Sequence, residues 1–391
     1  MSVPPLLAIG TGVGLAALAG TLATRYDQST VAAYILTGVS LGVVVPLLPW
    51  QAHLAGLREV VIDGGIVLLL FSLGLHVDAH ELVADARLAT ALGSIDFAIN
   101  FTAGALVGLA FGFGPLGSLA MAGIVYASSS ALVTRALAQQ GWLEAPEAAP
   151  IVRSLVVEDV VVGVYLTVLT ALAARGGSTL AGVLGALQGL AFLAVVAALG
   201  WYGTGTLSRL LATASTEALL LRVLAVTTLV AGGAQALGVS AGVAAFVVGA
   251  VVDETPHDDR VERVARPLRS LFDVGLFVAI GAGVEPAAVF GVLDLLVAAL
   301  AVSVGGKLVT GWLAGRLYDL PRRGSLRVGL GLLARGEFSM IIATLTASAG
   351  VPGAAGILPP FAVAYVLVTS VLGASLLHNE SRLVAAIPGF E

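Results

Sequence analysis

Residues 152–166 read VRSLVVEDVVVGVYL, and the adjacent acidic residues Glu158 and Asp159 stand at the centre of this largely apolar stretch. They lie about eleven residues into an apolar run that begins near residue 147, which is close to mid-bilayer if the run is a spanning helix. An ionisable side chain at that depth is costly unless it is paired or hydrated, so it is a candidate for function. The pair therefore predicts a membrane helix that carries a polar site.

The composition supports a membrane protein over the whole length of the chain. Of the 391 residues, 58% are hydrophobic and 11% are charged, whereas soluble domains carry about 25% charged residues. The mean hydropathy is +1.01, and so few charges cannot cover so much apolar surface in water. The N-terminus lacks the basic segment of a cleavable signal peptide, so we expect the first span to be retained. The chain has no cysteine and a net charge of −5, which indicates neither thiolate metal sites nor a nucleic-acid partner.

Apolar runs of about 20 residues between turn signals predict about thirteen transmembrane helices. Their approximate limits are 5–25, 31–49, 58–77, 88–112, 115–139, 147–174, 179–203, 217–236, 239–253, 264–283, 287–317, 324–349 and 355–378. With these spans, fifteen of the 19 basic residues fall on one side of the bilayer and two, Arg58 and Arg175, on the other. The positive-inside rule then predicts an inner-membrane protein with its N-terminus outside and its C-terminus in the cytoplasm.

The two halves of the chain resemble each other when the sequence is shifted by 207 residues. The coinciding residues are Gly42 with Gly249, Gly74 with Gly281, Val77 with Val284, Asp78 with Glu285, Gly104 with Gly311, Gly108 with Gly315, and 117–119 with 324–326. A constant offset over about 80 residues indicates a duplicated unit.

The repeat predicts how the chain is organised. We expect a first six-helix repeat over residues 1–174, a linker helix over 175–210, a second six-helix repeat over 211–378 and a short cytoplasmic tail over 379–391. The odd linker inverts the second repeat, as in many secondary transporters, whose substrate sites lie between inverted repeats at the bilayer centre. An ancient duplication without a transport role is the alternative.

Lys307 is the single lysine among the 19 basic residues, and it lies near the centre of the predicted span 287–317. A buried lysine can lose its proton, whereas arginine stays charged, so this position suits a group that changes protonation. The shift of 207 residues places Asn100 opposite it, so only one repeat carries the charge. A salt bridge to Glu158 that fastens two helices is a compatible alternative.

Two matched spans are each interrupted at their centres. Residues 332–343 read LLARGEFSMIIA, with Arg335 and Glu337 at mid-span, and the repeat mate carries the serines of 128–130, including Ser129 and Ser130. Such a pair predicts two discontinuous helices that cross, with freed carbonyl groups and helix ends beside the carboxylates. Arg335 and Glu337 either belong to the ion site or compensate the helix dipoles at the crossing.

The acidic residues of the sixth span need not act together. Neighbouring residues on a helix point about 100° apart, so one carboxylate can face a cavity while the other reaches an adjacent helix. A carboxylate removed from water attracts either a proton or a cation, although a structural ion pair is the alternative for both Glu158 and Asp159. Asp96 and Asn100 share a face of the fourth span, where we expect a polar packing contact rather than a transport role.

Several of these stretches resemble one known family. Residues 127–147, ASSSALVTRALAQQGWLEAPE, followed by the acidic stretch at 152–166, resemble the core of the monovalent cation:proton antiporter-2 family, which includes Kef-type potassium and Nap-type sodium antiporters. Residues 68–78, LLLFSLGLHVD, resemble the third-helix signature of that family, and residues 275–286, GLFVAIGAGVEP, and 332–343 resemble its C-terminal half.

The resemblance implies an antiporter fold with a dimerisation domain and a six-helix core, working as a homodimer by elevator-like movement. It implies that Asp159 binds the ion and that Lys307 pairs with the carboxylate at 158. Position 158 is aspartate in sodium-type members and glutamine in Kef-type members, so Glu158 departs from both patterns. Glu337, Ser129 and Ser130 match positions that line the crossing.

The sequence therefore predicts a secondary transporter and not an enzyme, with no cofactor. Na⁺ or K⁺ would exchange for H⁺ at Asp159 and Glu158, aided by oxygens of Ser129 and Ser130, while Lys307 holds Glu158 until a cation binds. If Lys307 also exchanges its proton, transport responds to membrane potential. The alternatives are a sodium-coupled symporter of an organic solute and a non-transporting membrane sensor subunit. The choice between Na⁺ and K⁺, the stoichiometry, the pH set point and the regulatory partners are left open.

Overall fold

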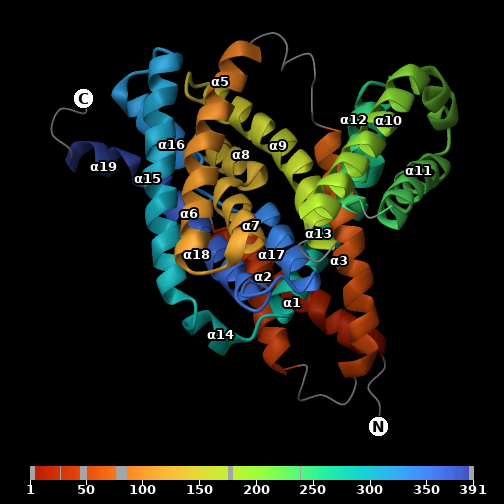
Figure 1. Cartoon of the computed structure of the whole chain (residues 1–391), viewed down its shortest axis with the longest axis horizontal. Helices are drawn as coiled ribbons and strands as arrows, with labels where there is room; N and C mark the ends of the chain where they lie inside the picture. The colour runs from red at the N-terminus through yellow and green to blue at the C-terminus, as the bar shows by residue number, and fades with distance from the viewer. Residues whose placement is uncertain are drawn as a thin grey trace. The chain divides into compact units, whose positions relative to one another are not determined.

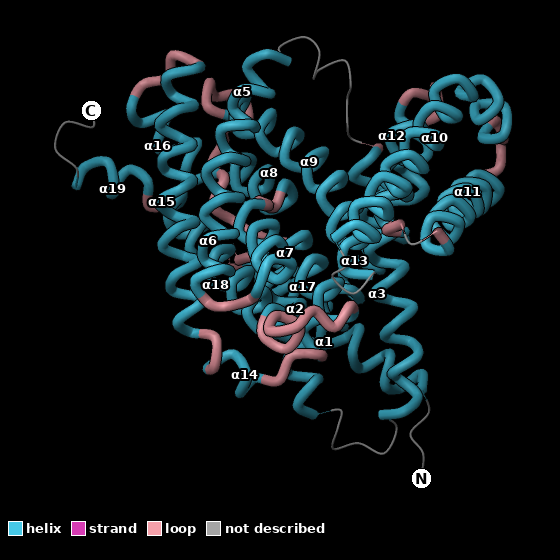
Figure 2. The backbone as a smooth tube through the Cα atoms, in the orientation of Figure 1, coloured by secondary structure: helices cyan, strands magenta, loops and turns pink. Residues whose placement is uncertain are grey.

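The computed structural model describes residues 5–26, 28–44, 51–75, 86–174, 179–237 and 239–386. Within these ranges the regular structure is helical and contains no strand (Figure 1, Figure 2). Each of the thirteen predicted apolar stretches contains helix in its described part. Seven of the described helical segments are long and apolar enough to cross a membrane by themselves. The all-helical membrane class is therefore confirmed, while the number of crossings stays a prediction.

The described helices follow one another along the chain, and several predicted spans, among them 115–139 and 324–349, are divided between two or more helices (Figure 1). In chain order they are α1 (Pro5–Arg25), α2 (Thr30–Val44), α3 (Gln51–Gly74), α5 (Ala86–Asp96), the π-helical turn η2 (Phe97–Phe101), α6 (Thr102–Ala110), α7 (Gly114–Tyr126), α8 (Ser130–Gln139), α9 (Ala148–Ala174), α10 (Thr179–Leu211), α11 (Thr216–Ala236), α12 (Ala241–Asp253), α13 (Asp258–Ala282), α14 (Pro286–Phe290), α15 (Leu293–Leu317), α16 (Arg322–Gly331), α17 (Glu337–Ser348), α18 (Leu358–His378) and α19 (Glu380–Ala386).

The chain folds into two compact units. The first unit comprises residues 1–48, 81–162 and 280–391, and the second comprises 49–80 and 163–279. Each unit takes segments from both halves of the chain, so it does not coincide with a sequence repeat. The repeat boundaries at 174 and 210 stay predictions, and the start of the predicted linker at 175–178 lies outside the described residues.

Repeat-related glycines lie at repeat-related helix contacts within the first unit. A Cβ atom at Gly104 of α6 would lie 2.8 Å from the Cα atom of Ala122 in α7. At the matching position, a Cβ atom on Gly311 of α15 would lie 2.7 Å from the Cα atom of Gly329 in α16. The residues of the second contact, Gly311 and Gly329, lie 207 positions after those of the first, Gly104 and Ala122, which is the shift that the sequence shows. Glycine is needed at both because the backbones approach too closely for any side chain.

The other repeated contact joins the two halves of the chain. In the second unit, Gly74 of α3 meets Gly249 of α12, and an added Cβ on Gly74 would lie 3.0 Å from the Cα of Gly249. In the first unit, their repeat mates Gly281 and Gly42 bring the end of α13 against α2, where a Cβ on Gly42 would lie 2.6 Å from the Ala282 carbonyl oxygen. Each of these contacts therefore pairs a helix from one half with a helix from the other.

An arginine cluster at the start of α16 anchors the C-terminal helix α19. Arg323 donates two hydrogen bonds to the Glu380 carboxylate, at 2.7 and 2.9 Å, and Arg327 donates a third at 3.2 Å. Arg327 also pairs with Glu147 and lies 4.1 Å from the ring centroid of Trp142. The hydrogen bond from Arg323 holds the pKa of Glu380 below its ordinary value, so this anchor is charged at neutral pH.

Replacing Gly311 with alanine should destabilise the first unit. The new methyl group meets the backbone of α16, which cannot move aside as a flexible side chain would, and such overpacking costs about 1–3 kcal/mol. Gly305→Ala on the same helix is the matched control, since nothing lies within 4 Å of its Cβ position and alanine favours helix. Thermal unfolding of the purified protein should show a lower midpoint for G311A alone; equal midpoints would contradict the close packing of α15 on α16.

Candidate functional site

Two interrupted helices cross in the first unit. Residues 127–129 separate α7 from α8, and residues 332–336 separate α16 from α17. The Ser129 N–H donates to the Ala334 carbonyl oxygen at 2.9 Å, so the two extended segments hydrogen-bond to each other. The predicted pair of discontinuous crossing helices is therefore confirmed.

Ser129 and Gly336 set how closely the segments pass. A Cβ atom at Gly336 would lie 2.6 Å from the Cβ of Ser129, so a side chain at position 336 would push the segments apart. Ser129 caps α8 by accepting a hydrogen bond from the Leu132 N–H at 3.5 Å, and its hydroxyl donates to the Glu337 carboxylate at 3.0 Å. The crossing thus fixes both a helix cap and a carboxylate.

Arg335 lies where the carbonyl ends of two half-helices meet. Its fully buried guanidinium donates to the carbonyl oxygens of Tyr126, the last residue of α7, and Leu332, the residue directly after α16, both at 3.3 Å. It also donates to the hydroxyls of Ser128 at 2.8 Å and Ser303 at 2.7 Å. A positive charge at two carbonyl ends compensates their negative dipoles, as the structural interpretation of Arg335 requires.

The amino ends of the other half-helices face the acidic residues. Glu337 is the first residue of α17, and Asp159 of α9 lies near Ser130, the first residue of α8. The Ser130 side chain lies close to the Asp159 carboxylate, and the negative charge of Glu337 acts on that carboxylate. Asp159 is 6% exposed and Glu337 5% exposed. Carboxylate and hydroxyl oxygens are the ligands that hard cations prefer, so this group can bind a small cation.

Glu158 is bound at the other side of the crossing. Its Oε2 atom accepts from the Ser128 N–H at 2.6 Å, and its Oε1 atom accepts from the Ser128 hydroxyl at 3.1 Å. The Lys307 ammonium group lies 2.9 Å from the same Oε1 atom. The two neighbouring acids therefore have different surroundings, with Glu158 paired to a cation and Asp159 beside a second carboxylate.

Lys307 has a second partner that the sequence did not reveal. Its Nζ atom lies 2.7 Å from Oδ2 of Asp96, and both side chains are fully buried. Asn100, four residues after Asp96, donates to Oδ1 of that carboxylate at 2.9 Å. The expected polar packing contact of Asp96 and Asn100 is thus part of a buried ion-pair network.

Other residues of this network are harder to identify from the sequence. Ser303 and Thr310 lie four residues before and three after Lys307 on α15, so helical periodicity places them on the lysine face and could have identified them. Tyr365 of α18 shares a 2.6 Å hydrogen bond with Ser303 and accepts one from Arg335 at 3.4 Å. Nothing in the apolar sequence around Tyr365 marks it as a partner of the crossing.

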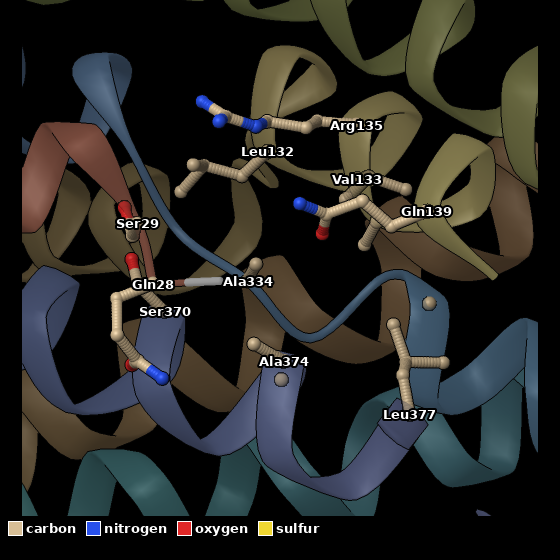
Figure 3. Close-up of a pocket in the computed structure, with 13 residues that line it drawn as sticks. Gln28, Ser29, Leu132, Val133, Arg135, Gln139, Ala334, Ser370, Ala374 and Leu377 are labelled. Atoms are coloured by element: carbon tan, nitrogen blue, oxygen red, sulfur yellow. The ribbon is translucent and has the colours of Figure 1, made fainter. Parts of the chain in front are cut away.

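A cavity opens beside the crossing, between α8 and α18. Figure 3 shows Ala334 between the side chains of α8, such as Leu132 and Arg135, and those of α18, such as Ser370 and Leu377. The Ser370 hydroxyl donates to the Arg335 carbonyl oxygen at 3.3 Å. The cavity reaches the interrupted segment of α16–α17, whereas Asp159 and Glu337 are not part of its lining.

The chain that builds this site matches known proteins in sequence and in fold. Residues 13–378 match the family model described as sodium/hydrogen exchanger, transmembrane. The chain belongs to this exchanger family. The predicted class, a monovalent cation:proton antiporter, is thereby confirmed, and the chain is a transporter and not an enzyme.

The sequences of known relatives match this exchanger-family chain over nearly its full length. It is 30% identical to the K(+)/H(+) antiporter subunit KhtU of Bacillus subtilis, over 96% of this chain and 93% of that protein. It is 28% identical to the Ammonium/H(+) antiporter subunit AmhT of Alkalihalophilus pseudofirmus, over 95% and 92%. The fold resembles that of the sodium proton antiporter MjNhaP1 from Methanocaldococcus jannaschii, with a TM-score of 0.75 and 13% identity over 96% of this chain and 97% of that one.

Replacing Arg335 with lysine should destabilise the exchanger although the charge is kept. A lysine cannot bond the Tyr126 and Leu332 carbonyl groups and the Ser303 hydroxyl together, because only the guanidinium has the forked geometry. Each buried acceptor left without a donor costs about 1–3 kcal/mol. Thermal unfolding should show a clear loss for R335K and little change for the exposed control Arg25→Lys. An unchanged midpoint for R335K would contradict the role of Arg335 at the helix ends.

Proposed function

We propose that this chain exchanges Na⁺ or K⁺ for H⁺ across the membrane, with the cation and the proton competing for Asp159. The observation that carries the proposal is the position of Asp159, buried beside the Glu337 carboxylate and the Ser130 hydroxyl at the crossing. Two neighbouring carboxylates away from water cannot both stay charged without a positive ion. Either a proton or a metal cation satisfies them, which makes the two ions alternatives at one site.

The ligands for the cation come from the crossing. Asp159 and Glu337 supply carboxylate oxygens, and Ser129 and Ser130 supply hydroxyl oxygens at the amino end of α8. Glu158 stands next to Asp159 along α9 and is held by Ser128 and Lys307. We propose that Glu158 joins the cation when it binds and returns to Lys307 when the cation leaves. The neighbouring acids would then titrate as a coupled pair.

Exchange also requires that the site faces each side of the membrane in turn. We propose that the crossing helices move as part of an elevator-like core within a homodimer, in the inner membrane, with the N-terminus outside and the C-terminus in the cytoplasm. The glycine contacts that repeat at an offset of 207 residues support an inverted-repeat arrangement, which provides two related states. The excess of arginine on one predicted side supports the orientation.

Asp159→Asn should abolish cation-dependent proton flux. Asparagine keeps the shape of the side chain but can neither take up the proton nor balance the charge of the cation. The measurement is the recovery of internal pH in proteoliposomes after addition of Li⁺, Na⁺, K⁺, Rb⁺ or NH₄⁺, at several pH values. NH₄⁺ is included because one relative is named as an ammonium antiporter.

Asp294→Asn is the control, because Asp294 is exposed in the first turn of α15. It should transport like the unmodified protein, and the series of cations then identifies the substrate. Flux that persists in D159N would contradict the proposal. Flux that requires an added organic solute would favour a symporter, and no flux with any ion would favour a sensor subunit.

A further inference from the structure

The Lys307 ammonium group binds two carboxylates at once. It lies 2.7 Å from Asp96 and 2.9 Å from Glu158, and all three side chains are buried. The two carboxylates differ in what else holds them. Glu158 is bound to the interrupted segment between α7 and α8 through Ser128, whereas Asp96 is bound to its own helix and to α15.

The π-helical turn η2 explains how Asp96 is held. Asn100, within this turn, donates to the Asp96 side chain at 2.9 Å and to the Asp96 carbonyl oxygen at 3.1 Å. The same amide nitrogen lies 3.3 Å from the hydroxyl of Thr310, one turn beyond Lys307 on α15. Gly306 leaves room for the Asn100 amide, since a Cβ atom there would collide with it. π-helical turns often occur at functional sites, and this one places a fixed carboxylate against the lysine.

Two of the groups that bind Glu158, the Lys307 ammonium group and the Ser128 hydroxyl, each have a second hydrogen-bond partner. Lys307 retains Asp96 if Glu158 leaves. The Ser128 hydroxyl has one proton, and it can donate to the Leu332 carbonyl oxygen at 2.9 Å instead of to Glu158 at 3.1 Å. Leaving a buried ammonium group without a counter-ion would be strongly unfavourable. With Asp96 in place, Glu158 can leave without creating that state.

We propose that Asp96 is a positioning residue that holds the Lys307 ammonium group in place while Glu158 is released to the cation. The inference rests on the proposed function, because it assumes that cations bind beside Glu158 and Asp159. Its consequence is that the Lys307 ammonium group stays paired with a carboxylate when Glu158 leaves.

The test measures cation-driven proton flux in proteoliposomes after the charge of Asp96 is removed alone and then together with that of Lys307. In Asp96→Asn, Glu158 is the one carboxylate left to Lys307, so the ion pair between them should persist and Glu158 should be less available to the cation. The KM for the cation should therefore rise at least tenfold, while the maximal rate changes less. In the double variant Asp96→Asn/Lys307→Gln, Glu158 is free again, and the KM should return to within about threefold of the unmodified value.

A purely structural role for Asp96 gives a different result. The double variant would then be at least as impaired in KM as D96N, and its thermal stability would be lower still; either absence of rescue or an unchanged KM in D96N overturns the proposal. Asp294→Asn again serves as the control. Failure of the proposed function is distinguishable, because the unmodified protein would then show no cation-driven proton flux at all.

Discussion

The hydrogen bond from the Ser129 N–H to the Ala334 carbonyl oxygen joins two helices at the points where each is interrupted. Backbone groups that a break releases inside a membrane must find partners within the protein, because lipid offers none. Here each break supplies partners to the other, and Arg335 binds the carbonyl ends of α7 and α16 that remain. The rest of the site depends on this constraint, since the breaks alone bring helix ends of both polarities to one place.

The polarity of those ends divides the buried charges into two groups. The carbonyl ends lie beside Arg335, near the ion pair that Lys307 forms with Glu158. The amino ends lie beside Asp159 and Glu337, where a positive dipole favours negative charge. Adjacent residues on α9 thereby differ in surroundings: Glu158 is held by protein donors, while Asp159 lies beside a second carboxylate, where we propose that a cation or a proton binds.

Much of this arrangement could be predicted from the sequence, and the reasons are physical. Charges and glycine–serine breaks are rare in apolar spans, so Glu158, Asp159, Lys307 and the two interrupted helices were identifiable from position alone. The shift of 207 residues also anticipated which glycines occupy equivalent helix contacts.

The remaining parts depend on how separate spans pack. The pairing of Asp96 with Lys307 requires knowing which face of the fourth span meets α15, and the π-helical turn η2 alters that face locally. The contacts of Tyr365 could not be predicted for the same reason. Its hydroxyl meets Ser303 and Arg335 only because α18 packs against α15 and α17. The two compact units likewise combine segments from both halves, which a linear division of the sequence could not show.

The central claim is that a cation and a proton occupy the Asp159 site alternately. Adding the transported cation to the purified protein in weakly buffered detergent solution tests this claim directly, through the protons released on binding. The account predicts about one proton released per cation bound, with a cation affinity that weakens as the pH falls, and no release from the Asp159→Asn protein. Cation binding without proton release, at an affinity independent of pH, would contradict it.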